Sequence, residues 1–119
     1  MWVELVGDMI VARMRGQPSE ELLRKVQHEV LRLAAESGRW RVLLDVLEMK
    51  PPAVELASVQ RKLDEDRRAL GLRRAIVVPD SRLAYLARLA FGEGDYRVFY
   101  NDMVGAVKWL AKERVPASS

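Results

Sequence analysis

Cysteine is absent from the 119 residues of this sequence, which excludes a disulfide framework and thiol chemistry. Histidine occurs once, at His28, without nearby residues that could complete a catalytic pair or a metal site. No apolar run approaches the ~20 residues needed to cross a bilayer. The first eight residues contain acidic but no basic side chains, so we expect no signal peptide. These absences favour a cytoplasmic protein that needs neither metal nor cofactor.

The charge balance raises the question of nucleic acid, because the net charge is +3 and the isoelectric point is about 9.5. However, the 20 basic residues are interleaved with 17 acidic ones along the chain. The densest basic cluster, Arg67-Arg68 and Arg73-Arg74, directly follows three acids at 64–66. This pattern is typical of a solvated helix face, so no nucleic-acid partner is expected.

The stretch Arg41–Lys50 predicts a central strand. Six of its ten side chains are apolar, and Val42–Leu44 are consecutive, so both faces of the strand need cover. A parallel strand between two layers of helices has this pattern. Gly38 before it and Pro51-Pro52 after it restrict the segment to strand length.

Strand and helix patterns alternate through the rest of the chain. The order β-β-α-β-α-β-α-β-α predicts one α/β domain over residues 1–115, followed by a disordered tail at 116–119. Right-handed crossovers then give a mostly parallel five-stranded sheet with helices on its faces and an antiparallel edge strand. The predicted strands are Trp2–Val6, Met9–Met14, Arg41–Lys50, Arg74–Pro79 and Tyr96–Tyr100, and the helices are 20–37, 53–70, 81–91 and one capped by Asn101 or Asp102.

Two features of this prediction concern packing. One core is expected to hold Leu43, Leu44, Val46, Ile76, Val77, Val78, Val98 and Leu110. The first helix carries an apolar stripe of Leu22, Val26, Val30, Leu33 and Ala34. On the outer face of the second helix, acids and bases four residues apart, such as Arg61 and Glu65, are expected to pair.

Asp45 is the unusual residue of the central strand, because a carboxylate there needs hydrogen bonds or a cation. One interpretation is a site residue, such as the phosphoacceptor of a receiver domain. The acidic pair and the lysine that accompany such an acceptor are missing at the ends of the other strands. We therefore favour a structural role, in which Asp45 bonds backbone amides near Pro51 or pairs with Arg39 or Arg41.

Catalytic motifs are also missing. Gly92 and Gly94 form a Gly-x-Gly that leads into a strand instead of a helix, so it lacks phosphate-binding geometry. The serines look like helix caps or helix residues, and none has a histidine and an acid beside it. An enzyme is not expected.

The C-terminal part of the chain carries a family resemblance. A strand with Arg97 and Phe99 is followed by a helix with Ala106, Trp109 and Leu110. These residues match the "R-x-F" and "A-x-x-W-L" patterns that close members of the SpoIIAA-like branch of the STAS superfamily. Leu43-Leu44-Asp45 is likewise similar to the "llD" strand of that family. The resemblance implies a bacterial STAS-type fold, related to anti-sigma-factor antagonists and to the lipid-binding CRAL-TRIO fold.

The chain departs from this family at two positions. Antagonists with a phosphorylation switch carry a serine at the start of the second helix, whereas Pro51–Leu56 here contains none. The acids that open the last helix of the family are replaced by Met103-Val104-Gly105. The resemblance therefore implies a non-enzymatic regulatory or protein-interaction module without the phosphorylatable serine.

Two functions remain open. The first is binding of a protein partner through the second and third helices, with partner identity and a homodimer undecided. The alternative is binding of a small apolar or lipid-like ligand in a crevice under the third helix. That helix is expected to be mobile and anchored by its last aromatic residue. The candidate binding residues are Met49, Pro51, Val54, Ser58, Ser81, Tyr85 and Phe91.

Overall fold

The computed structural model describes residues 1–92 and 94–112, without the side chain of Leu70. The predicted tail at 116–119 and Glu93, between Gly92 and Gly94, lie outside the described residues. The elements are β1 Trp2–Val6, β2 Met9–Gly16, α1 Glu20–Ser37, β3 Arg41–Met49, α2 Val54–Leu63, the 3-10 helix η1 Arg67–Gly71, β4 Arg73–Val78, α3 Ser81–Phe91, β5 Tyr96–Tyr100 and α4 Met103–Ala111.

The five strands form a single sheet in the order β1-β2-β3-β4-β5. β1 pairs antiparallel with β2, and the other neighbours are parallel. The predicted topology is therefore confirmed. β3 lies in the middle of the sheet, where each of its edges pairs with another strand, as its continuous apolar run requires.

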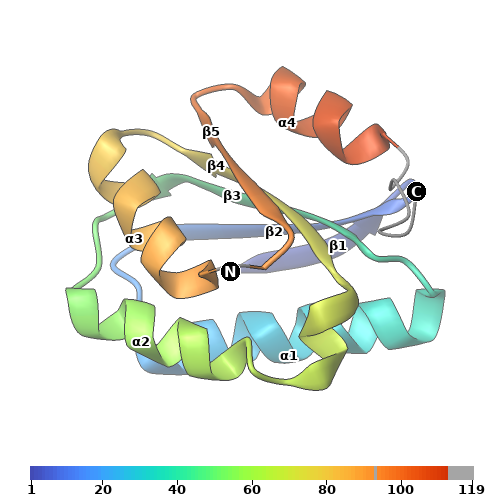
Figure 1. Ribbon diagram of the computed structural model, residues 1–119, viewed down its shortest axis with the longest axis horizontal. Helices are drawn as coiled ribbons and strands as arrows, with labels where there is room; N and C mark the ends of the chain where they lie inside the picture. Colours follow the sequence, from blue (N-terminus) through green and yellow to red (C-terminus); the bar gives the residue numbers. More distant parts are fainter. Residues whose placement is uncertain (93, 113–119) are drawn as a thin grey trace.

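The two faces of the sheet are covered unequally. Helices α1, α2 and α3 lie on one face, and α4 lies alone on the other (Figure 1). The prediction of one core is wrong, because neighbouring strand residues point to opposite faces and so enter two separate clusters. Leu44, Val46, Ile76 and Val78 face the three helices, Leu43 and Val77 pack with Leu110 of α4 on the other face, and Val98 is only half-buried.

Helix α1 begins and ends where its capping residues predict. The Ser19 hydroxyl accepts a hydrogen bond from the Leu22 backbone at 3.1 Å, and Gly38 ends the helix in the left-handed region at φ 71°. The buried residues of the helix are Leu23, Val26, Val30 and Leu31. The buried face of α1 therefore lies slightly to one side of the predicted stripe. Leu22, Leu33 and Ala34, which were expected in the stripe, are half-buried at the edges of this face.

Asp45 has a different partner from those expected. It is 6% exposed and lies opposite Arg13 in the β2–β3 register. Arg13 donates from Nε to its Oδ2 at 3.0 Å, and the Leu47 backbone donates to Oδ1 at 3.1 Å. Arg41 instead contacts Asp8 and donates to the Leu110 carbonyl. Asp45 therefore satisfies its charge within the sheet, which supports the structural role.

Helix α2 ends seven residues earlier than predicted, at Leu63 instead of Leu70. Asp64 turns towards the sheet and pairs with Arg74, while Asp66 caps η1. The Asp66 carboxylate accepts from the backbone and side chain of Arg68 at 3.0 and 3.1 Å. These contacts are present instead of the ion pairs between residues four positions apart that were expected in this part of the helix.

The Asp66–Arg68 contact gives a testable shift in pKa. The hydrogen bonds from the Arg68 side chain and backbone lower the pKa of Asp66 to about 2. This carboxylate therefore favours folding above about pH 4, and that contribution is lost as the pH falls through about 2. Replacing Arg68 with alanine is expected to raise the pKa of Asp66 above about 3. A carboxylate NMR titration measures both values, and an unchanged midpoint in R68A would contradict the assignment to Arg68.

Candidate ligand and partner site

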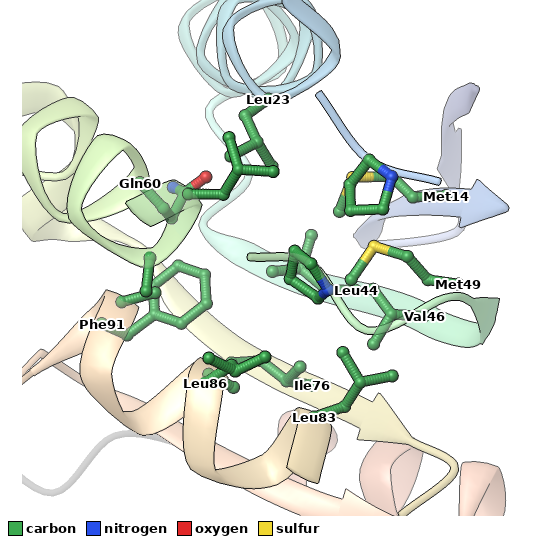
Figure 2. A pocket seen from close by; sticks show the side chains of 16 residues that line it. Met14, Leu23, Leu44, Val46, Met49, Gln60, Ile76, Leu83, Leu86 and Phe91 are labelled. Carbon is green, nitrogen blue, oxygen red and sulfur yellow. The ribbon is translucent and has the colours of Figure 1, made fainter. Parts of the chain in front are cut away.

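An apolar cavity of about 80 Å³ lies between the sheet and helices α1, α2 and α3. Its walls come from three strands, three helices and the loops after β2 and β3. Figure 2 shows Gln60 and Phe91 on one side of the cavity and Met14 and Met49 on the other. The lining residues are Met14, Pro18, Leu23, Leu44, Val46, Met49, Pro52, Leu56, Ala57, Gln60, Ile76, Leu83, Leu86, Ala87, Ala90 and Phe91.

The sequence builds this cavity by placing small residues on two facing helices. Ala57 of α2 and Ala87 and Ala90 of α3 line it, and α2 packs against α3. Larger side chains at these positions would fill the space between the helices and the sheet. The neighbouring Leu83 and Leu86 of α3, three residues apart, close the wall on the same helix face.

Gln60 is the one polar side chain among the described residues that line the cavity. Its amide nitrogen donates to the Gln27 side-chain oxygen at 3.4 Å, and Gln27 in turn donates to the Leu63 carbonyl at 3.4 Å. Both hydrogen bonds are long, so the amide of Gln60 is held weakly. A ligand in the cavity can therefore engage it at small cost.

The buried Arg74 of β4 organises the end of the site near the C-terminus of α3. Arg74 is 4% exposed, and both terminal nitrogens donate to the Asp64 carboxylate, with Nη2 2.7 Å from Oδ2. Its guanidinium lies 4.6 Å from the centre of the Phe91 ring, which also packs 5.8 Å from the Tyr96 ring. Arg74 thus joins the end of α2 to the end of α3. The sequence interpretation missed it by treating the arginines as solvated.

The structure separates the seven predicted site residues into two groups. Met49 and Phe91 line the cavity. Pro52 lines it in place of the neighbouring Pro51, which is exposed. Exposed positions on or just before α2 and α3 are occupied by Pro51, Val54, Ser58, Ser81 and Tyr85.

The residues that carry the family resemblance hold α4 on the sheet. Phe99 of β5 packs against Trp109 of α4 with ring centres 5.9 Å apart, and Arg97 lies over Phe99 at 5.4 Å. Ala106 and Leu110 of α4 are fully buried between the helix and the sheet. The pattern therefore marks a packing interface of the fold and is remote from the cavity on the opposite sheet face.

This arrangement of strands and helices is a SpoIIAA-like fold. Two solved structures share it across almost their whole length. The chain is similar to the anti-sigma factor antagonist SpoIIAA in its unphosphorylated form, with a TM-score of 0.67, 10% identity, and 94% of this chain and 98% of that chain covered. It is also similar to an uncharacterised DUF3478-family protein with a SpoIIAA-like fold from Shewanella loihica, with a TM-score of 0.64, 22% identity, and 92% and 91% covered.

Other comparisons add no family assignment. No protein-family model and no curated protein sequence matches the chain. Within residues 1–92 and 94–112, none of the helices is both long and apolar enough to span a membrane.

Proposed function

We propose that this chain is a non-enzymatic regulatory module that binds a protein partner without a phosphoserine switch. The likeness to an anti-sigma factor antagonist across almost the whole chain carries this proposal. The start of α2 supports the missing switch. Ala53 occupies its N-cap position without a side-chain hydrogen bond, and no serine lies in Pro51–Leu56.

The outer faces of α2 and α3 are the surface that we assign to the partner. The two helices pack side by side, so their exposed residues form one continuous surface. Val54 and Tyr85 are 54% and 58% exposed on it, and Ser58 and Ser81 supply polar groups. A large aromatic side chain that is free in the monomer is the residue type that most often anchors a protein interface.

Site-specific cross-linking in the native cells tests this surface. A photoreactive residue at position 85 is expected to trap the partner, whereas one at Val104, 66% exposed on α4, is not. A cross-link to a second copy of the chain would identify a homodimer. Once the cross-linked partner is identified, Tyr85→Ala should weaken its binding to this chain about thirtyfold, which is the effect of losing one aromatic anchor. Equal trapping at both positions would contradict the assignment of the partner surface to α2 and α3.

The apolar cavity favours a second function, which is binding of a small apolar or lipid-like ligand. Pockets for drug-sized ligands measure about 300–1,000 Å³, whereas the cavity here has about 80 Å³. In its present form it therefore admits at most a molecule of about one ring. A longer ligand requires α3 to move away from the sheet, with Phe91 leaving its place over Arg74.

Hydrogen exchange tests this movement. We expect the amides of Leu83–Gly92 to exchange at least about a hundredfold faster than those of Val42–Val46, because α3 can open without breaking the sheet. Helix α1 covers the same sheet face and provides the control, with exchange close to that of the core strand. If α3 exchanges as slowly as β3, it is not a mobile cover and only ligands that fit the closed cavity remain.

A further inference from the structure

A second cavity of about 30 Å³ lies beside the first and differs from it in polarity. Met14, Leu44, Gln60 and Phe91 line both cavities, so these four residues form the boundary between them. In Figure 2, Gln60 and Phe91 lie on one side of the larger cavity and Met14 lies on the other. The smaller cavity adds two polar residues, Gln27 and Arg74, to its wall, together with Val26, Val30, Val42 and Leu72.

Arg74 lines this cavity and carries an unused hydrogen-bond donor. Its two terminal nitrogens bond to Asp64, but its Nε is buried and has no hydrogen-bond partner within the described part of the chain. A buried donor without an acceptor destabilises the protein, because the donor has lost its water and gained nothing in return. An acceptor placed in the cavity would remove that deficit.

The charges around Arg74 determine which acceptor fits. Asp64 already neutralises the guanidinium, and Gln27 and Gln60 carry no charge. An anionic ligand would lose its water and meet the Asp64 carboxylate beside the Arg74 cation, so a neutral oxygen is favoured over a carboxylate or phosphate. The larger cavity has about half the ~150 Å³ of an engineered cavity that takes up benzene, so the apolar part is at most one ring and enters only if the surrounding side chains move.

We propose that the ligand is a small neutral molecule with a single aromatic ring or a short aliphatic body and one hydroxyl or carbonyl oxygen. The apolar body occupies the larger cavity, and the oxygen passes between Gln60 and Phe91 to accept a hydrogen bond from Nε of Arg74. Rotation of the flexible Met14 and Gln60 side chains opens the boundary. This inference rests on the ligand-binding function proposed above and specifies its ligand class.

Phenol and toluene form a matched pair of probes, because they have nearly the same size and only phenol carries an oxygen. Titration of the intact protein, followed by amide and arginine Nε–H NMR signals, is expected to show both probes binding beside Leu44 and Leu86. Phenol should bind about fivefold more tightly than toluene, the effect of one added hydrogen bond. Only phenol should shift the Nε–H signal of Arg74.

Two variants and one further probe complete the test. Ala57→Leu fills the larger cavity and should weaken both probes at least about tenfold. Arg74→Lys keeps the positive charge but removes Nε, so it should abolish the preference for phenol while toluene still binds. Benzoate should bind more weakly than phenol.

The failures are distinguishable. If neither probe binds the wild-type protein, the ligand-binding function itself fails. If toluene binds as tightly as phenol and the Arg74 signal does not move, the cavity binds apolar molecules but the proposed role of Arg74 is wrong. Tighter binding of benzoate would replace the neutral ligand class with an anionic one. The comparison on the wild-type protein decides the proposal even if the Arg74 variant does not fold.

Discussion

Replacing Leu44 with aspartate is expected to lower the free energy of unfolding by more than about 4 kcal/mol, a large part of the total stability of a typical domain. Leu44 is 7% exposed on β3, with β2 and β4 on either side and α1, α2 and α3 above its face. A carboxylate at this position is buried among apolar side chains, and Arg74, which lines the same small cavity, is already paired with Asp64. Urea denaturation followed by circular dichroism measures the loss.

The same substitution at Leu5 is the matched control. Leu5 lies on the edge strand β1 and is 38% exposed, so an aspartate there keeps its water. Leu5→Asp should cost about 1 kcal/mol, mainly through the poor strand preference of aspartate. A folded Leu44→Asp protein with a stability close to that of Leu5→Asp would show that β3 is not the centre of the core.

The sheet could be predicted from the sequence because its signals are local. Val42–Leu44 and Ala75–Val78 are continuous apolar runs, which is the pattern of strands with helices on both faces. Ser19 and Gly38 define both ends of α1 through capping rules that involve only neighbouring residues. Once strands and helices alternate, the handedness of the crossover leaves few topologies.

Long-range contacts explain why the end of α2 and the partner of Asp45 were predicted incorrectly. The helical pattern continues past Leu63, and nothing local shows that Asp64 is drawn towards Arg74 on β4. Asp45 likewise pairs with Arg13, 32 residues away, a contact that depends on the register of β2 against β3. In both cases a charge finds its partner through the tertiary structure, so a sequence window around it contains no signal.

The cavity could be predicted only in part for a related reason. Met49 lies at the carboxyl end of a strand and Phe91 at the end of α3, positions that the topology directs towards one sheet face. The space itself comes from Ala57, Ala87 and Ala90. Alanine also has the highest helix propensity, so its presence in a helix pattern does not distinguish a cavity wall from ordinary packing.

Replacing Asp64 with alanine is the second change with a large expected effect. Asp64 and Arg74 have side chains that are 11% and 5% exposed, and Phe91 lies over the guanidinium. Removing the carboxylate leaves a buried positive charge without a counterion, which should cost about 3–5 kcal/mol. Denaturant unfolding measures this cost. The exposed pair Glu20–Arg24 on α1 is the control, since Glu20→Ala should cost about 0.5 kcal/mol or less.

The double variant Asp64→Ala/Arg74→Met separates the two causes of this loss. If the stranded charge is responsible, removing it as well should restore most of the stability, because methionine occupies the volume of the arginine stem and contacts Phe91 through its sulfur. If the loss instead comes from the ends of α2 and α3 separating, the double variant should be at least as unstable as Asp64→Ala. The recovered stability measures the coupling between the two residues. A single Asp64→Ala variant within about 1 kcal/mol of the wild type would show that water reaches Arg74 and that the pair does not hold α2 and α3 together.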